Sequence, residues 1–419
     1  MRISVHDFGG YPYPFALSRE LAARGHAVQH VYCASHHATP AGTFEGQPDL
    51  PSALTIDAVR LRETLDKESL GKRWRQEHEY GRKAAAVTLR FKPDVLLSAN
   101  MPLDAQRYLI RTCRVHEIRF VFWVQDLIGV ASHRILRRKI PLMGGAVGRY
   151  YLSMERRQLA QSDQIVVLTE DFVPILRDWD IAEERIHVIH NWAPVEELPL
   201  REKDNSWSRA HGLHDKRCFL YAGTLGLKHN PDILLQLALH FRTVSDVRVV
   251  VLSQGAGADW LRAQVKRHQL HNLLLLPYEP FERMPDVMAA ADVLVAILEP
   301  DAGVFSVPSK VLAYFCAGRA LLLALPLENL AARIAMEQKA GVVVDPRDIK
   351  GFVDGAQRLL ADPTARQKAG ARARAYAERT FRISGIVDQF GRILQTSPSR
   401  PRADGFDSLP QSRTSEAPA

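Results

Sequence analysis

The chain has 419 residues, of which 46% are hydrophobic and 24% charged, and its formal net charge is +8. This length predicts two domains with sizeable cores, and the composition is that of ordinary globular proteins. The basic residues are spread along the chain rather than gathered in blocks. This pattern disfavours nucleic acid as a partner and leaves phosphorylated ligands or an anionic lipid surface.

The cysteines and the apolar runs indicate in which cellular compartment the protein is expected. The four cysteines are far apart and form no Cys-x-x-Cys pair, so we interpret them as buried reduced thiols, which favours the cytoplasm. Charged residues interrupt the first apolar run, so we expect no secretory signal. No stretch reaches the uncharged length needed to span a bilayer. The sequence predicts a protein that is soluble or attached only at a membrane surface.

The first residues predict a strand–helix–strand unit. Residues 2–8 read as a strand, 15–24 as a helix and 27–33 as a second strand, with Gly9 and Gly10 in the loop after the first strand. Ligands bind at this edge of open α/β sheets, and glycine lets a ligand approach the backbone. Because Gly-x-Gly-x-x-Gly is missing, the loop is a weak candidate for a dinucleotide site.

The rest of the first half continues this pattern. A surface loop (36–51) and a long polar helix (65–90) precede four further apolar runs that read as strands of a parallel sheet buried on both faces. These runs are residues 94–98, 120–124, 164–168 and 185–189. We expect a first domain over residues 1–192 and a linker over 193–216, where prolines replace periodicity.

Residues 130–158 mix basic and apolar side chains at helical spacing. Arg134, Arg137 and Arg138 lie among Ile135, Leu136 and other apolar residues. Such a segment can lie on an anionic membrane face. The alternative is a solvated helix face whose arginine stems cover the core.

The second half predicts another α/β domain over residues 217–395, whose last helix is a candidate to pack back on the first domain. Helix is expected over 352–378, and residues 396–419 have a disordered composition. The predicted strands are residues 219–222, 247–252, 273–276, 292–298, 320–325 and 342–344.

Two loops of this domain predict an anion site. After the first strand, Gly223, Thr224 and Gly226 precede Lys228, a pattern that lets backbone N–H groups and one mobile cation meet an anion. It is equally read as a glycine turn with a surface lysine. Gly255, after the next strand, is a weaker candidate for backbone contact with a nucleotide.

The second loop follows the strand at 292–298. It holds Glu299 and Asp301, and residues 306–310 then open a helix with Ser309 and Lys310 in its first turn. A helix N-terminus with these residues suits a phosphate or diphosphate. The alternative is an ordinary strand–loop–helix unit with a chance Pro-Ser-Lys.

We expect no metal. Asp178-Trp179-Asp180 fits an Asp-x-Asp pattern but falls between a helix and a strand, far from the glycine loops. Three histidine pairs have metal-like spacings without a fitting Cys or Glu, so structural histidines are the better interpretation.

These motifs, in this order, resemble the GT-B glycosyltransferases of the retaining family-four type, in particular the bacterial exopolysaccharide branch of colanic-acid-type transferases. The resemblance spans residues 1 to about 390. Its matching stretches are Gly9-Gly10, Trp123 to Asp126, Val188 to Trp192, Tyr221 to Pro231, and Ser306 to Lys310 through Gly318.

The resemblance implies a fold and a reaction. The fold would be two Rossmann-like parallel-sheet domains facing a cleft, with a nucleotide-sugar donor on the second domain and an acceptor on the first. Lys228, Ser309 and Lys310 would stabilise the diphosphate leaving group without a metal, with Ser306 in the same motif. Asp126 would occupy the cleft, and Gly10 would lie near the donor phosphates.

Two departures from the family pattern matter. Many members carry two Glu where this chain has Phe305 and Ala313, and a His near the position of Gln125. Glu299 or Asp301 is a candidate to contact the donor hydroxyls instead. The resulting prediction is a transferase at the inner face of the cell membrane that moves a sugar onto a lipid-linked oligosaccharide. The rivals are a nucleotide-sugar epimerase of the same fold and a catalytically silent nucleotide-sugar-binding partner.

Overall fold

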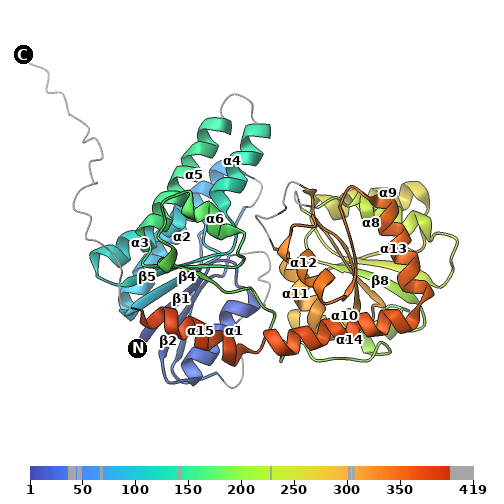
Figure 1. Cartoon of the computed structure of the whole chain (residues 1–419). Coiled ribbons are helices and arrows are strands. Elements are labelled where there is room, and N and C mark those ends of the chain that lie inside the picture. Colours follow the sequence, from blue (N-terminus) through green and yellow to red (C-terminus); the bar gives the residue numbers. More distant parts are fainter. Residues whose placement is uncertain are drawn as a thin grey trace, which may run out of the picture.

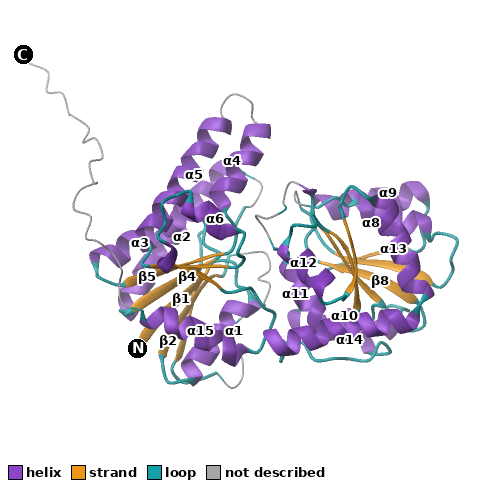
Figure 2. Ribbon diagram, in the orientation of Figure 1, coloured by secondary structure: helices purple, strands orange, loops and turns teal. Residues whose placement is uncertain are grey.

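The computed structural model describes residues 1–35, 44, 50–66, 69–139, 144–226, 229–300, 303 and 307–396. They form two α/β domains side by side, each a parallel sheet with helices packed on both faces (Figures 1 and 2). The predicted fold class is therefore correct. The predicted surface loop over residues 36–51 falls almost wholly outside the described part of the chain, and the segment predicted to be disordered, 396–419, lies outside it but for its first residue.

The described part of the first domain holds a seven-stranded sheet in the order β3-β2-β1-β4-β5-β6-β7, and neighbouring strands are parallel throughout. The edge strand β3 was not predicted, because it is only partly buried and carries Thr55 and Asp57. The strands are β1 (Arg2–Asp7), β2 (Ala27–Cys33), β3 (Leu54–Val59), β4 (Val95–Ala99), β5 (Arg119–Val124), β6 (Gln164–Val167) and β7 (Ile186–Val188).

The second domain repeats this plan with six strands in its described residues, in the order β10-β9-β8-β11-β12-β13. All six agree with the predicted apolar runs to within a few residues. They are β8 (Arg217–Ala222), β9 (Val247–Leu252), β10 (Leu273–Leu276), β11 (Val293–Ile297), β12 (Ala320–Ala324) and β13 (Gly341–Val344).

Helices connect the strands and cover the sheets. Those of the first half are α1 (Pro12–Ala23), α2 (Leu70–Phe91), α3 (Leu103–Val115), α4 (Ile128–Lys139), α5 (Gly144–Gln161), α6 (Phe172–Arg177) and the 3-10 turn η1 (Glu183–Arg185). Those of the second half are α7 (Ser206–Ala210), α8 (Asp232–His240), α9 (Ala256–His268), η2 (Phe281–Arg283), α10 (Met284–Ala289), α11 (Ser309–Cys316), α12 (Leu330–Glu337), α13 (Ile349–Ala361), α14 (Pro363–Thr380) and α15 (Ile383–Gln395).

The single helix expected over 352–378 is wrong. The structure has two helices, α13 and α14, which meet at Asp362. The Asp362 carboxylate accepts the backbone N–H of Ala365 at 2.8 Å, and Pro363 takes the first position of α14. An N-cap followed by proline starts a new helix, because proline has no N–H to continue the old one.

The last helix, α15, packs against the first domain although it follows the second (Figure 1). Phe390 contacts Trp123 with ring centroids 4.8 Å apart, and Trp123 stacks on Trp192 at 5.5 Å. Arg24, directly after α1, also pairs with Asp388 of α15. The two domains are thus tied by the linker after β7 and by α15.

Each sheet has one point where the order of strands reverses. It lies between β1 and β4 in the first domain and between β8 and β11 in the second. Loops at the carboxyl ends of such strand pairs leave a crevice in which α/β proteins bind ligands. The loops after β1, β8 and β11 carry several predicted site residues.

As for membrane spans, no helix in the described ranges has both the length and the apolar character to cross a bilayer.

Candidate functional site

Lys310 lies at the reversal point of the second domain, in the first turn of α11. Its Nζ sits over the Tyr221 ring, 3.8 Å from the centroid, and donates a hydrogen bond to the Tyr221 hydroxyl. Tyr221 is the fifth residue of β8 and is buried. Burial lowers the pKa of Lys310 to about 7, so the amine holds its proton weakly in the absence of a nearby anion.

Gly223 makes room for this lysine. Its φ is +141°, and a Cβ at this position would lie 2.7 Å from the Lys310 Nζ. Tyr221 in turn donates its hydroxyl proton to the carbonyl of Thr224 at 3.0 Å, which fixes the loop that follows β8. The predicted glycine loop and the predicted helix start therefore meet at one point, as their positions in the sheet require.

The first turn of α11 has an exposed residue and no side-chain cap. Pro308 is the N-cap of α11 and gives it no side-chain hydrogen bond, and Ser309 is exposed. The helix N-terminus contributes a partial positive charge beside Lys310.

The loops after β8 and β9 are joined to each other. Ser253 accepts the N–H of Leu225 at 3.1 Å, and Gly257 donates its N–H to the Leu225 carbonyl at 3.2 Å. Thr224 shares a 2.7 Å hydrogen bond with the Tyr278 hydroxyl beyond β10. Gly255 has a φ of +94° at the N-cap of α9. These contacts place the predicted Thr224 and Gly255 in neighbouring loops of one sheet edge.

Of the other predicted donor residues, Gly226 lies in the same loop and donates its N–H to His229 Nδ1 at 3.2 Å. Glu299 is partly buried and lies two residues beyond the end of β11. Lys228, Asp301 and Ser306 lie outside the described residues, so the expected pairing of Lys228 with Lys310 stays a prediction.

In the first domain, Asp7 holds the loop that contains Gly10. Its fully buried carboxylate accepts the N–H of Gly9 and Tyr11 and the side-chain amide of Asn100, the last at 2.9 Å. Burial raises the pKa of Asp7 to about 7, although these hydrogen bonds act in the opposite direction. Gly10 has a φ of +65°, a conformation that favours glycine.

Amide side chains continue this network along the carboxyl edge of the first sheet. The Tyr13 hydroxyl donates to Gln125 at 3.1 Å, the Asn100 amide donates to Tyr13 at 3.0 Å, and Asn191 donates to Gln125. The network reaches from the loop after β1 to the linker. Asp126 follows Gln125 in the turn between β5 and α4 and is partly buried.

The basic segment forms the antiparallel pair α4 and α5, which projects from the first domain (Figure 1). Arg134 and Arg137 are exposed on α4. Nothing is described of the Arg138 side chain. Val147 and Tyr150 of α5 are also exposed, at 39% and 46%. This pair of helices thus carries both basic and apolar exposed side chains.

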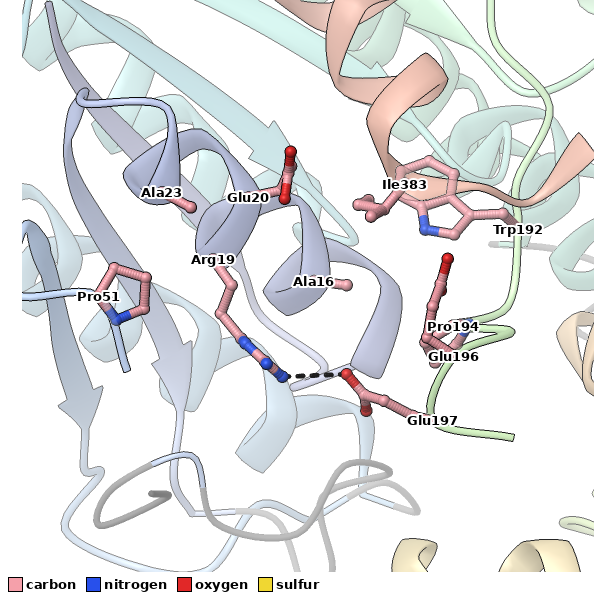
Figure 3. Close-up of a pocket in the computed structure, with 10 residues that line it drawn as sticks. All are labelled: Ala16, Arg19, Glu20, Ala23, Pro51, Trp192, Pro194, Glu196, Glu197 and Ile383. Atoms are coloured by element: carbon pink, nitrogen blue, oxygen red, sulfur yellow. Dashed lines mark hydrogen bonds and ion pairs between the residues drawn. The ribbon is translucent and has the colours of Figure 1, made fainter. Parts of the chain in front are cut away.

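A separate pocket of about 360 Å³ lies where α1, the linker and the start of α15 meet. Arg19 and Glu197 form a 3.1 Å ion pair at its rim, and Trp192 and Ile383 form its apolar wall (Figure 3). Its lining residues, all of them described, include none of the predicted site residues. We therefore place this pocket at the junction of the domains and not in the candidate site.

The metal patterns gain no support as sites. Asp180 of the Asp-x-Asp pattern is exposed and pairs with Arg156 at 2.6 Å. Within the described ranges, no three His, Cys, Asp or Glu side chains are grouped so as to hold a metal ion. The expectation of a metal-independent reaction stays a prediction.

Sequence analysis did not name Asp7, Tyr13, Asn100 or Tyr278. The signal for Asp7 was present, because an acidic residue that ends a buried strand directly before a glycine pair is placed to bind the N–H groups of that loop. Nothing in the sequence indicates that Tyr278 reaches the loop after β8, because this contact joins residues 54 positions apart.

Comparisons with known proteins agree with this geometry. The family described as "Glycosyl transferase 4-like domain" matches residues 9–192, and the family "Glycosyl transferases group 1" matches residues 203–376. A D-inositol 3-phosphate glycosyltransferase of Xylanimonas cellulosilytica is 26% identical over 267 residues. The match covers 59% of this chain and 61% of that relative.

Two solved structures share the fold. Sucrose-phosphate synthase from Thermosynechococcus elongatus has a TM-score of 0.72 at 16% identity, covering 94% of this chain and 98% of that chain. Anabaena HepE in complex with UDP-glucose has a TM-score of 0.69 at 13% identity, covering 94% and 99%. Because the two family matches lie one on each domain, the chain is a glycosyltransferase of the GT-B fold, made of a glycosyl transferase 4-like domain and a glycosyl transferases group 1 domain.

Proposed function

We propose that this glycosyltransferase moves a sugar, with retention of anomeric configuration, from a nucleotide-diphosphate sugar to a lipid-linked oligosaccharide in exopolysaccharide synthesis. The donor binds the second domain, and the acceptor approaches from the first. No metal takes part. The enzyme works in the cytoplasm, at the inner face of the cell membrane.

The observation that carries this proposal is the position of Lys310. Its amine is held over Tyr221, beside a helix N-terminus and a glycine loop, at the point where the strand order of the second sheet reverses. Negative charge develops on the diphosphate as it leaves, and a preorganised cation at that point stabilises the transition state more than the ground state. Solved structures of the same fold were obtained with UDP and UDP-glucose, which supports a nucleotide donor.

The membrane part of the proposal is supported by the pair α4 and α5. Exposed arginines lie on α4, and the exposed apolar residues Val147 and Tyr150 lie on α5. Arginines draw a protein to anionic lipid, and apolar side chains insert at the headgroup boundary. A lipid-linked acceptor would then meet the first domain without leaving the membrane. An epimerase needs no such surface.

One observation favours a second candidate, a nucleotide-sugar-binding partner without turnover. Ala313, at a position where many family members carry Glu, packs its methyl group against the core below α11. Such a protein would bind the donor but transfer nothing to any acceptor.

A thermal-shift screen with UDP, GDP, ADP and their sugar conjugates tests the donor site first. A ligand that binds only the folded state stabilises it and so raises the melting temperature. At a ligand concentration of a hundred times Kd, the stabilisation is about 2.7 kcal/mol. We expect one diphosphate to raise the melting temperature more than the others do, which would identify the nucleotide base of the donor. No shift with any of them would overturn the donor site.

Turnover of Lys310→Met then separates enzyme from silent partner. We expect wild type to consume the donor and the variant to lose roughly a hundredfold or more in kcat, the usual cost of removing one such donor. Lys266→Met, at an exposed position on α9, is the matched control and should be unaffected. Donor binding with no turnover in wild type over all lipid-linked and soluble acceptors tested would favour the silent partner.

A further inference from the structure

Glu155 is a buried carboxyl group that interacts electrostatically with the predicted site residue Asp126. It lies on α5 and has no exposed surface. Its Oε2 accepts the backbone N–H of Gly129, in the first turn of α4, at 3.0 Å. The N–H groups of Ile128 and Val130 also favour its charged form, and the charge of Asp126 opposes it. Glu155, on α5, thus accepts a hydrogen bond from the first turn of the neighbouring helix α4.

The contact is possible only because α4 and α5 approach closely. A Cβ on Gly129 would lie 2.8 Å from Glu155 Oε2 and 2.8 Å from the backbone oxygen of Tyr151. At the other end of the pair, a Cβ on Gly148 would lie 2.6 Å from the Cα of His133. Glycines at both contact points let the two backbones approach closely, and this short separation lets the Glu155 side chain reach the backbone of α4.

α5 is itself anchored to the body of the domain. Gln158 donates its side-chain amide to the carbonyl of Leu103 at 2.7 Å, and Tyr151 donates its hydroxyl to Asp104 at 2.9 Å. Both acceptors lie at the start of α3. Glu155 therefore connects the start of α4 to a fixed base rather than to a mobile surface.

The turn that Glu155 holds contains Asp126. The chain leaves β5 at Val124, and α4 begins at Ile128, so only three residues separate the end of the strand from the turn bound to Glu155. Fixing both ends of so short a connection fixes the backbone of Asp126. Burial raises the pKa of Glu155 to about 8, so at neutral pH it supports this turn mostly as a neutral acid and adds little negative charge beside Asp126.

We propose that Glu155 is a positioning residue for Asp126, holding the first turn of α4 so that the Asp126 carboxylate keeps its place in the active site. This inference rests on the proposed function and on the prediction that Asp126 occupies the cleft where the substrates bind. Glu155 itself touches neither donor nor acceptor. The rival interpretation is a cap that only stabilises the fold.

Three variants separate these interpretations. Glu155→Gln keeps the side-chain length and an oxygen that accepts the Gly129 N–H, and Glu155→Ala removes both. Gln158→Ala is the matched control, because Gln158 is a buried polar residue of the same helix, only 4% exposed, that binds α3 instead of α4, and its loss leaves Tyr151 to anchor α5 to Asp104. All three are compared at temperatures where each is fully folded.

For a positioning role we expect Glu155→Ala to lower kcat by about 10- to 100-fold, the usual cost of losing a residue that orients an active group, with the donor KM changed less than about threefold. Glu155→Gln should keep kcat within about threefold of wild type. Gln158→Ala should melt earlier and keep its kcat. Equal kcat losses in Glu155→Ala and Gln158→Ala, or no loss in Glu155→Ala, would overturn the proposal.

Amide hydrogen exchange of residues 126–130 makes the test independent of activity. Exchange in this segment should rise at least about tenfold in Glu155→Ala and stay at the wild-type rate in Gln158→Ala, because only the first loses the bond to Gly129. Unchanged exchange in Glu155→Ala overturns the positioning role even if wild type has no transferase activity. Absence of turnover in wild type with a faster exchange in Glu155→Ala would instead count against the proposed function alone.

Discussion

Arg333 of α12 donates a hydrogen bond to Asp171, just before α6, at 2.8 Å, and this ion pair joins the second domain to the first. Each partner of the ion pair also forms a hydrogen bond within its own domain. The Thr169 hydroxyl donates to Asp171 at 2.7 Å, and Arg333 also binds the carbonyl of Glu328. Val307, three residues before Lys310, packs against the cores of both domains. The two domains are therefore in contact at this ion pair and at Val307.

Removal of this ion pair should favour an open arrangement of the domains. The pair is partly exposed and is expected to contribute roughly 0.2–1 kcal/mol, so Arg333→Gln should raise the open population by about 1.4- to fivefold. Spin labels on the two domains measure this population by their distance distribution.

The Arg177–Glu183 pair provides the control for that measurement. It is an exposed pair of 2.6 Å within the first domain, so Arg177→Gln should leave the distance between domains unchanged. The exchange Asp171→Arg with Arg333→Asp should restore closure. If Arg333→Gln gives the wild-type distances, the ion pair does not control closure.

Binding of a nucleoside diphosphate should depend on pH through Lys310. Burial lowers its pKa to about 7, and a bound diphosphate raises it again, so binding takes up a proton at higher pH. Affinity for UDP, or for whichever diphosphate the screen identifies, should fall by up to about tenfold per pH unit above 7, which is about 1.4 kcal/mol. Calorimetry in buffers of different ionisation enthalpy measures the proton uptake directly. Lys310→Met should bind weakly and show a flat dependence over the same range. An equally steep fall in the variant would assign the proton to another group.

Gly223→Ala should weaken diphosphate binding, whereas Gly226→Ala should not. At Gly223 the φ of +141° disfavours any side chain, and the new Cβ would lie 2.7 Å from the Lys310 Nζ. We expect a loss of about 1–3 kcal/mol in the free energy of unfolding and weaker diphosphate binding. At Gly226 the nearest atom to a new Cβ is the Thr224 methyl at 3.8 Å, so binding should persist. Chemical denaturation and calorimetry on both variants provide the comparison, and equal behaviour would contradict the role of Gly223.

The sheets of this protein are predictable from its sequence because most of their strands are buried on both faces. β11 and β12 are continuous apolar runs and lie where expected. β3 was missed because an edge strand with Thr55 and Asp57 has neither an unbroken run nor a clean alternation. The break between α13 and α14 was readable from Asp362 and Pro363, but the alanine- and arginine-rich sequence on either side concealed it.

The candidate site was predictable at its backbone and less so at its side chains. The glycine loop and the helix start were found because strand order alone brings them together. That Lys310 turns onto Tyr221 follows from the packing of α11 on β8, which no local pattern encodes. The network from Asp7 to Asn191 likewise joins residues far apart in the chain through buried amides.

The membrane surface on α4 and α5 can be tested by charge reversal. Arg134→Glu with Arg137→Glu should weaken association with vesicles that contain anionic lipid, by about 1 kcal/mol for each arginine lost near the surface and more for reversal. Lys266→Glu with Arg267→Glu on α9 changes the net charge equally at an exposed site of the other domain. Flotation of both double variants with phosphatidylglycerol vesicles distinguishes them. Equal losses in the two would attribute binding to net charge and leave α4 as a solvated helix face.

The buried His30 should make stability depend on pH in mildly acid solution. Its ring packs edge-on against the stacked rings of Phe15 and Phe44, with Ser18 at 2.9 Å from Nδ1, and burial lowers the pKa of His30 to about 3. Between pH 6.5 and 3 the unfolded chain therefore binds one more proton at this residue than the folded protein does. Stability should rise with pH across this window by about 1.4 kcal/mol per unit from His30 alone, and be flat with respect to this group above it.

His30→Gln removes that titration while keeping a polar partner for Ser18. Asp7, whose pKa is raised to about 7, has the opposite sign over much of this range, so the informative quantity is the difference in slope between wild type and variant. Denaturation at several pH values from 4.5 to 6.5 should give the variant a slope lower by about one proton, whatever its loss in packing. An unaltered slope in His30→Gln would mean that His30 is protonated in the folded state, and its ring would then need a partner for the second N–H.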